Sequence, residues 1–135
     1  MKILHACSYT VWLIGQLLLA TWTVLFDTLT GNKNIDPCIV HYPLRVTSDW
    51  HITVFAASIT LTPGTMTCTI IDEDPDQIKG PRHFVVHAVY GSDPHAVLKD
   101  LRVMEEKLAP HVREIEQHFQ DAVIEYPVNV PVKKV

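Results

Sequence analysis

The chain has 135 residues, a formal net charge of -4 and no stripe of basic residues, which argues against a nucleic-acid surface and against strong binding to anionic lipid headgroups. Its three cysteines, Cys7, Cys38 and Cys68, are an odd number without CxxC spacing. They support neither a disulfide framework nor a zinc site, and they mildly favour a reducing compartment.

The N-terminal segment is strongly apolar, and residues 3–26 contain no Asp, Glu, Lys or Arg. The core of a bilayer needs roughly 20 apolar residues in one helix, so this segment is long enough to cross it. We therefore predict a transmembrane helix over residues 1–30. The amide of Gln16 would lack a partner in lipid, so we expect Gln16 to contact another protein helix.

A cleaved signal peptide is the alternative, because Lys2 precedes the apolar segment. The apolar part of a signal peptide usually runs about 7 to 15 residues and ends at a small-x-small site, which residues 26–28 do not offer. The pattern therefore favours a retained helix. Lys2 on one side and Lys33 and Arg45 on the other leave its orientation open.

The rest of the chain is long enough for one small domain. We predict a linker over residues 31–37, an α+β domain over residues 38–125 and an extended tail over residues 126–135. In that domain, residues 38–46 fit a strand, which Pro43 confines to a sheet edge or distorts.

The next segment, residues 49–61, is ambiguous, because its β-branched content fits a strand and its apolar spacing fits a helix. We favour a helix capped by Ser48 or Asp49. Its apolar face would hold four residues: Ile52, Phe55, Ala56 and Ile59.

Two further strands are predicted from alternating patterns, over residues 66–71 and 82–89, and the first should be half-buried. The acidic residues 72–76 between them fit a solvated hairpin tip better than a calcium loop. His83 and His87 share one face of the later strand. Without a third ligand they indicate hydrogen-bonded or surface histidines rather than a metal or proton-relay site.

A helix should begin at Asp93 as N-cap with Pro94 at the first helical position, and Pro110 should interrupt it. A second helical segment or kinked extension would follow over residues 112–119, and a last strand would lie within residues 122–128. The apolar face of the main helix would hold five residues: Val97, Leu98, Leu101, Met104 and Leu108.

The predicted fold class is therefore an α+β membrane protein, with one N-terminal transmembrane helix and a small β-α-β-β-α-α domain that becomes ferredoxin-like or similar if the last strand forms. The chain has no nucleophile elbow, phosphate-binding glycine loop or triad spacing. We therefore expect no enzymatic activity, and no cofactor or metal.

The hydrophobic helix and four motifs that follow it in order resemble the E subunit of the Mrp (Mnh, Pha) multisubunit sodium/proton antiporters, and this resemblance covers roughly residues 10–120. Members of that family commonly have more hydrophobic helices at the N-terminus, so we expect a shorter membrane anchor here. The motifs are Tyr42-Pro43-Leu44-Arg45, Ser58 to Thr65 with Thr62-Pro63-Gly64-Thr65 at its end, Val86-His87-Ala88 and Asp93-Pro94.

The resemblance implies a place in a large inner-membrane assembly that exchanges cytoplasmic sodium for external protons. Its partners would be the other subunits and membrane lipid, with the domain on the cytoplasmic side. An ion pathway usually requires ionisable residues within the membrane, and here only His5 and Asp27 lie at the ends of the span. We therefore expect an accessory, non-catalytic role in assembly or stability.

The motif Thr62-Pro63-Gly64-Thr65, called the TPGT turn below, also predicts geometry. Proline fixes φ and glycine permits positive φ, which together favour a type II turn, while the threonine hydroxyls can cap backbone groups. Whether this turn serves folding alone or docks on a neighbouring subunit stays open. The alternative function is a membrane-tethered or secreted module that binds a small ligand or metal on the face of His83 and His87.

Overall fold

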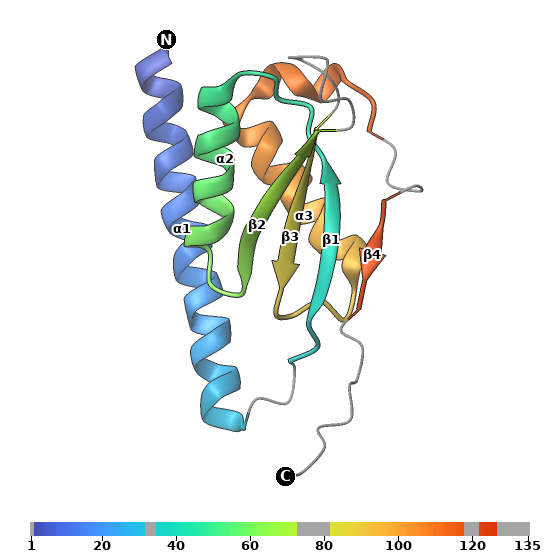
Figure 1. The fold of residues 1–135 in the computed structure, drawn as a ribbon. Helices are drawn as coiled ribbons and strands as arrows, with labels where there is room; N and C mark the ends of the chain where they lie inside the picture. Colours follow the sequence, from blue (N-terminus) through green and yellow to red (C-terminus); the bar gives the residue numbers. More distant parts are fainter. Residues whose placement is uncertain (1, 32–34, 73–81, 118–121, 127–135) are drawn as a thin grey trace.

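The computed structural model describes residues 2–31, 35–72, 82–117 and 122–126. Figure 1 shows a long N-terminal helix beside a compact α+β domain. The elements are α1 (Lys2–Thr30), β1 (Cys38–Pro43), α2 (Asp49–Leu61), β2 (Thr65–Asp72), β3 (Arg82–Ala88), α3 (Pro94–Leu108), the 3-10 helix η1 (Pro110–Glu114) and β4 (Ile124–Glu125).

The four strands form one sheet in the order β2-β3-β1-β4, and every neighbouring pair is antiparallel. Together with α2 and α3 this gives the β-α-β-β-α-β order of a ferredoxin-like fold, which confirms the predicted α+β domain. β2 and β3 form the predicted hairpin, although its tip, together with residues 32–34, 118–121 and 127–135, lies outside the described residues.

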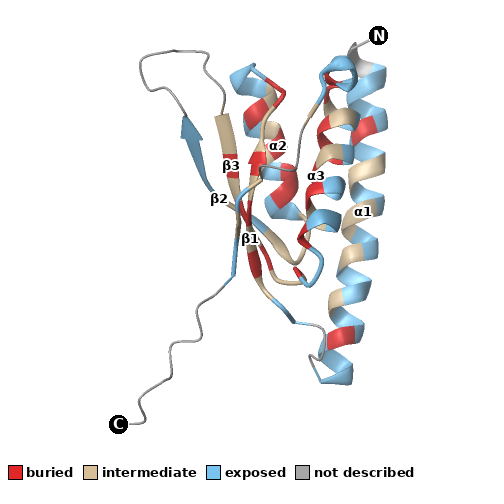
Figure 2. Cartoon of the chain, turned by 90° about the vertical axis from the view of Figure 1, so that its right-hand side faces the viewer, coloured by how far each residue is buried: buried red, intermediate tan, exposed pale blue. Residues whose placement is uncertain are grey.

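The structure has three layers, which Figure 2 shows edge-on: the sheet, then α2 and α3, then α1. The core lies between the sheet and the pair α2 and α3. At its centre the ring of Phe55 lies 5.7 Å from the ring of Tyr42 and 5.6 Å from that of Phe84. Around them pack the other buried apolar residues, among them Cys38, Val40, Ile52, Ile59, Val86, Leu98, Leu101 and Val112.

β1 is shorter than predicted and is not an edge strand, because it lies between β3 and β4. It ends at Pro43, not at residue 46. The backbone N–H of His41 points toward β4, where it donates to the carbonyl of Val123, so the missing N–H of Pro43 lies on that same side. Among the described residues β4 is paired with Ile39 and Val40 and does not reach Pro43, so Pro43 costs this part of the sheet no hydrogen bond.

β2 forms as predicted, but the expectation that it is half-buried is wrong. It lies at one edge of the sheet, and Met66, Ile70 and Ile71 are 40 to 49% exposed. The pairing register shifts between Thr67 and Thr69, and such a bulge breaks the alternation that the sequence pattern assumes.

Both predicted helices of the domain form. In α3 the carboxylate of Asp93 accepts from the N–H groups of His95 and Ala96, as expected of an N-cap. In α2 Ser48 occupies the N-cap position without a side-chain hydrogen bond. Over the described residues 110–117 the chain makes the short 3-10 helix η1, whose Val112 is buried, rather than a longer second helix, and the end of the predicted segment lies outside the described residues.

Candidate interaction site between the first helix and the TPGT turn

α1 lies against the helical layer along one stripe of its surface. Its buried and half-buried residues recur every three or four positions, the spacing of one helical face. Near the N-terminal end the Nε2 of His5 donates to the carbonyl of Leu108 at 3.0 Å. The residues of this stripe are Tyr9, Trp12, Leu13, Gln16, Leu17, Ala20, Val24 and Asp27.

Two further hydrogen bonds attach α1 to the domain. The hydroxyl of Tyr9 donates to Oγ of Ser58 at 2.8 Å in a buried position, and Ser58 in turn donates to the carbonyl of Val54. Near the other end of α1 the hydroxyl of Tyr90 donates to Oδ2 of Asp27 at 3.3 Å, and Asp27 is only 3% exposed. Contacts therefore hold α1 along most of its length.

The TPGT turn joins α2 to β2, and its two threonines cap the end of α2. The hydroxyls of Thr62 and Thr65 both donate to the carbonyl of Ile59, at 2.7 and 2.8 Å, and lie 2.8 Å from each other. The N–H of Thr65 closes the turn on the carbonyl of Thr62. These hydroxyls satisfy a helix-end carbonyl that would otherwise lack a partner.

The glycine of the turn is required by its backbone. Gly64 has φ of 97°, the value that the third position of a type II turn needs, with Pro63 before it. A Cβ at Gly64 would lie 3.1 Å from Cδ2 of Tyr90. The carbonyl of Gly64 accepts from the N–H of Val89 at 2.8 Å, so the turn is also fixed to the end of β3.

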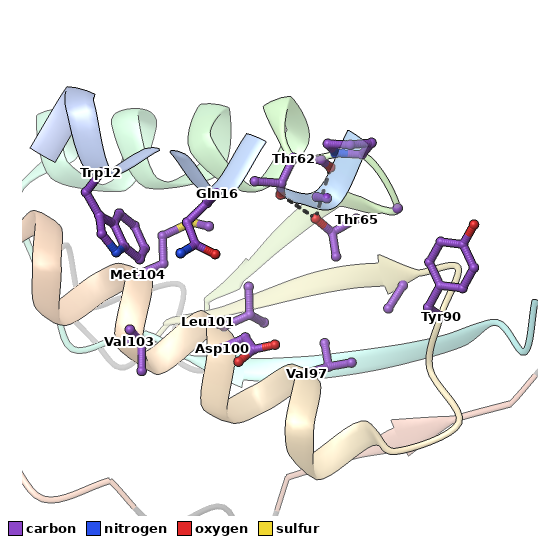
Figure 3. Close-up of a pocket in the computed structure, with 14 residues that line it drawn as sticks. Trp12, Gln16, Thr62, Thr65, Tyr90, Val97, Asp100, Leu101, Val103 and Met104 are labelled. Carbon is purple, nitrogen blue, oxygen red and sulfur yellow. Dashed lines mark hydrogen bonds between the residues drawn. The ribbon is translucent and has the colours of Figure 1, made fainter. Parts of the chain in front are cut away.

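α1, the TPGT turn and α3 surround a cavity of about 390 Å³. Figure 3 shows Trp12 and Gln16 of α1 facing α3 across it, with Thr62 and Thr65 on one side. The lining residues are Trp12, Gln16, Ala20, Thr62, Pro63, Gly64, Thr65, Ala88, Tyr90, Val97, Asp100, Leu101, Val103 and Met104.

The wall of this cavity has two notable polar groups, Gln16 and Asp100. Gln16 lies near Met104, so this amide faces a helix of its own chain (Figure 3). No hydrogen bond joins it to the described residues. Desolvation at the cavity wall raises the pKa of Asp100 above its ordinary value, and the charge of Lys99 partly opposes this rise. The cavity is therefore mainly apolar, and the carboxylate of Asp100 lies at its solvent-exposed rim.

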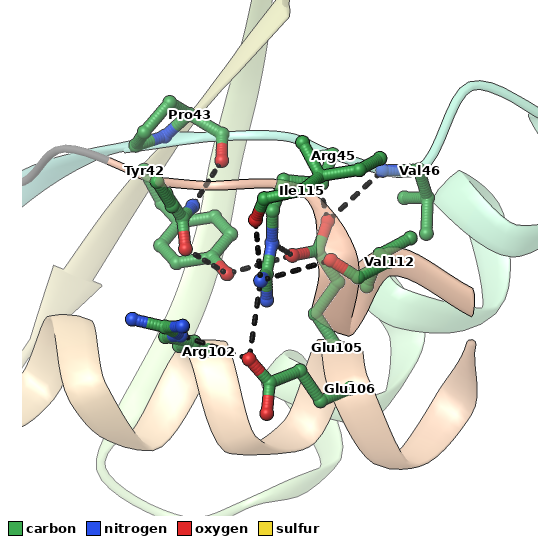
Figure 4. Close-up of polar contacts among 10 residues, drawn as sticks. Tyr42, Pro43, Arg45, Val46, Arg102, Glu105, Glu106, Val112 and Ile115 are labelled. Carbon is green, nitrogen blue, oxygen red and sulfur yellow. Dashed lines mark hydrogen bonds and ion pairs between the residues drawn. The ribbon is translucent and has the colours of Figure 1, made fainter. Parts of the chain in front are cut away.

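A buried ion pair lies at the other end of the domain, where β1 leaves the sheet (Figure 4). Nε of Arg45 donates to Oε2 of Glu105 at 2.7 Å, and the two side chains are 3% and 0% exposed. The other oxygen, Oε1, accepts from the N–H groups of Arg45 and Val46. The hydroxyl of Tyr42 also donates to Oε2 at 2.8 Å.

This network extends from α3 to η1. Nη1 of Arg45 donates to Oε1 of Glu106 and to the carbonyl of Val112, while Arg102 donates to the same oxygen of Glu106. Hydrogen bonds from Arg102 and Arg45 lower the pKa of Glu106, and burial together with the charge of Glu105 raises the pKa of Tyr42. These contacts fix the chain between β1 and α2, so their role is structural.

The histidines of β3 do not form a metal site with the residues that the structure describes. His83, Val85 and His87 alternate with buried residues and lie on the open face of the sheet, where His41 of β1 donates to Oε1 of Glu125 at 2.9 Å. Within the described ranges no three His, Cys, Asp or Glu side chains are placed to hold a metal ion.

The site therefore combines a rigid turn, a docked helix and a small cavity. From the sequence we singled out the TPGT turn and Gln16, and the structure brings all five residues to one cavity. The pair Arg45 and Glu105 and the contact between Tyr9 and Ser58 were not found from the sequence. In a single sequence, a buried glutamate such as Glu105 cannot be distinguished from a glutamate on the exposed face of a helix.

The chain is thus a small α+β protein, in which an N-terminal helix precedes a ferredoxin-like domain. Residues 4–30 of that helix are long and apolar enough to cross a membrane. Residues 1–111 match the MNHE family, described as Na+/H+ ion antiporter subunit. The chain belongs to this family.

Two curated relatives are both named as the E subunit of a Na(+)/H(+) antiporter. The one from Bacillus subtilis is 32% identical over 99 residues, which is 73% of this chain and 58% of the relative. The one from Alkalihalophilus pseudofirmus is 28% identical over 86 residues, which is 64% of this chain and 50% of the relative. The chain thus spans about half the length of these curated relatives.

A solved structure of similar fold is a chain in the structure of the Mrp complex from Dietzia sp. DQ12-45-1b. It is 26% identical, superposes with a TM-score of 0.59, and the match covers 83% of this chain and 96% of that chain. These matches confirm the resemblance to the E subunit of Mrp antiporters that the sequence motifs suggested.

Proposed function

We propose that the chain is an accessory, non-catalytic subunit of a multisubunit monovalent cation/proton antiporter, and that it is needed for assembly or stability of the complex. Its partners are the other subunits of an Mrp-type antiporter, together with membrane lipid. The family match supports membership of such a complex, because the related chains are named as antiporter subunits and one was solved within an Mrp complex.

The chemistry of α1 carries the accessory role. Between residues 3 and 26 it has no Asp, Glu, Lys or Arg, whereas a pathway for protons or cations through a membrane depends on ionisable groups inside it. Asp27, the one carboxylate of α1, is buried and accepts from Tyr90. An acid held in this way positions a helix rather than relaying ions.

We also propose that the domain lies on the cytoplasmic side of the cell membrane. Cys7, Cys38 and Cys68 are all free thiols, which suits a reducing compartment. The TPGT turn lies at the edge of the cavity beside α1 and presents a rigid surface next to the membrane-associated helix. This surface is our candidate for the contact with a neighbouring subunit.

The test is purification of the tagged chain from membranes in mild detergent, with mass spectrometry of the chains that accompany it. Recovery of several large polytopic chains is expected, and their loss from the membrane when this chain is deleted would establish the assembly role. A chain that purifies alone, with unchanged sodium/proton exchange in the deletion strain, would overturn the proposal.

The contribution of the TPGT turn is tested separately with Pro63→Ala. If the variant chain stays abundant and folded but no longer retains the polytopic chains, the turn is a docking element. If the variant chain itself disappears from the membrane, the turn serves folding. A matched control is Pro110→Ala, which changes a proline at the exposed start of η1, away from the cavity.

A further inference from the structure

α1 has two different faces, and the domain covers only one of them. The covered stripe runs from Tyr9 to Asp27, and the hydrogen bonds to Ser58 and Tyr90 lie near its two ends. The opposite face carries no charged side chain and is rich in large apolar ones. The exposed ones, each at least 48% accessible, are Leu4, Val11, Ile14, Leu18, Leu19, Trp22, Leu25, Phe26 and Leu29.

The docked helix cannot at the same time cross a bilayer. Tyr9 and Asp27 lie about 27 Å apart along the helix axis at about 1.5 Å per residue, which nearly equals a hydrocarbon core of about 30 Å. If α1 crossed the bilayer while it stayed docked over this length, the whole domain would lie within the hydrocarbon core. The exposed residues Lys99 and Asp100 of α3 and the open edge of β2 would then meet lipid, which membranes exclude.

The outward face of α1 is better suited to acyl chains than to another helix. Helices that pack closely in membranes use small residues at the contact, because these let the backbones approach. The outward face also exposes the small residues Cys7, Ser8 and Gly15. Most of it, however, is leucine, valine, isoleucine, Trp22 and Phe26. Bulky side chains of this kind suit the fluid interior of a leaflet.

We propose that α1 lies in the plane of the membrane, with its outward face in the acyl region of one leaflet and the domain docked on its other face. An ordinary in-plane helix has a charged polar face toward water. α1 has no charged face of its own, and the docked domain supplies the polar side that faces water. This explains how an uncharged helix can lie stably at the membrane surface. The inference rests on the membrane location within the proposed function and differs from the predicted single span.

Spin labels on the outward face test this orientation. Val11, Leu18 and Leu25 lie seven residues apart on one face, and each is replaced by Cys in a chain with Cys7→Ser and Cys68→Ser, while buried Cys38 is kept. The full chain, with the chains that accompany it, is reconstituted in phosphatidylethanolamine/phosphatidylglycerol vesicles. Immersion depth is measured from the accessibility of each label to oxygen and to a nickel chelate.

An in-plane helix gives high oxygen access and the same depth at all three positions. A transmembrane helix instead gives a label at Leu18 that is much deeper than those at Val11 and Leu25, and this profile overturns the inference. Labels shielded from both reagents would show that another subunit covers the face, which also overturns it. Gln16→Cys on the cavity side is the matched control, because docking shields it from both reagents.

A second measurement reports docking directly. Tyr9→Cys combined with Ser58→Cys should be joined in membranes by a short bifunctional thiol reagent, whereas Val11→Cys combined with Ser58→Cys should not. Absence of the first cross-link would show that α1 leaves the domain in the membrane. Co-purifying chains in the same preparations test the proposed function, so failure of that proposal is distinguishable from failure of this one.

Discussion

Arg45 and Glu105 form an ion pair of 2.7 Å that is almost completely removed from solvent. Both carboxylate oxygens are used, since Oε1 accepts two backbone N–H groups and Oε2 accepts from Arg45 and Tyr42. Arg45 belongs to Tyr42-Pro43-Leu44-Arg45, one of the motifs singled out in the sequence. Its role in this structure is to fix the path from β1 into α2, and thereby the position of the TPGT turn at the other end of α2.

We expect Glu105→Gln to destabilise the chain by about 3 to 5 kcal/mol, because it leaves a buried guanidinium without its counter-charge. The measurement is urea unfolding of the purified chain in mild detergent, followed by circular dichroism. Arg102→Gln is the control, since Arg102 is 38% exposed and its pair with Glu106 should be worth less than about 1 kcal/mol. Equal effects of the two substitutions would contradict the structural role of the buried pair.

We expect Gly64→Ala to cost about 1 to 3 kcal/mol, because its φ of 97° strains any residue with a Cβ and the added atom would lie 3.1 Å from Tyr90. Gly15→Ala in α1 is the matched control. A Cβ there meets nothing within 4 Å, so that change should be neutral or stabilise the helix by up to about 1 kcal/mol. Thermal unfolding of both variants makes the comparison, and a Gly64→Ala chain as stable as the wild type would count against the type II turn.

Much of the fold could be predicted because local signals and tertiary packing agree. The cap at Asp93, the Pro63-Gly64 turn and the alternation of β3 each depend on neighbouring residues alone, and each appears where it was expected. The position of β1 within the sheet could not be predicted, because it depends on how β4, far along the chain, pairs with it.

The site was predictable only in part, for a similar reason. Gln16 stands out in the sequence as an amide in an apolar segment, and the TPGT turn stands out by its Pro-Gly pair. The role of Tyr9 and Ser58 is visible only in the structure, because it depends on a hydrogen bond between α1 and α2. The apolar composition of α1 predicts a membrane helix, but composition carries no information about the stripe that docks on the domain.

The stability of the fold should fall in acid partly through Glu106. Hydrogen bonds from Arg102 and Arg45 lower its pKa below the ordinary value of 4.5, so the folded state favours the ionised form. Its stabilising contribution is therefore present above pH 4.5 and is lost as the pH falls through the lower folded value. Urea unfolding between pH 3 and pH 7, at about half-unit steps, should show a shallower loss in Glu106→Gln than in the wild type.

Asp100 supplies a control of opposite sign. Asp100 is exposed to solvent on one side, but partial desolvation where it lines the cavity raises its pKa above 3.8, so its ionisation opposes folding as the pH rises through that range. Asp100→Asn should therefore be more stable than the wild type at neutral pH and similar to it at the acid end of the same titration. If the free energy of unfolding changed with pH in the same way in the wild type, Glu106→Gln and Asp100→Asn, neither carboxylate would be coupled to folding.

Cys38 should resist alkylation in the native chain. Burial raises the pKa of its thiol, and the charge of Asp36 adds to this rise, so little reactive thiolate is present and access is closed. Cys68 is exposed on the edge strand β2 and should react with maleimide readily. Mass spectrometry of peptides labelled at pH 7.5 to 8, at about one-minute intervals, would follow both sites. Unfolding in urea should make the labelling rates of Cys38 and Cys68 equal. Rapid labelling of Cys38 in the native chain would show that the beginning of β1 opens.

The hydroxyl of Tyr9 should contribute about 0.5 to 1.5 kcal/mol to the docking of α1, the net value of a buried hydrogen bond between neutral groups. Tyr9→Phe keeps the ring and removes only this donor, while Ser58 keeps its own bond to the carbonyl of Val54 at 2.8 Å. A double-mutant cycle with Ser58→Ala isolates the pair, since the second substitution should cost less once the first is present. Thr23→Val is the control, because its hydroxyl bonds only within α1, to the carbonyl of Leu19. Additive effects of Tyr9→Phe and Ser58→Ala on urea unfolding would mean that α1 and α2 do not meet as the structure shows.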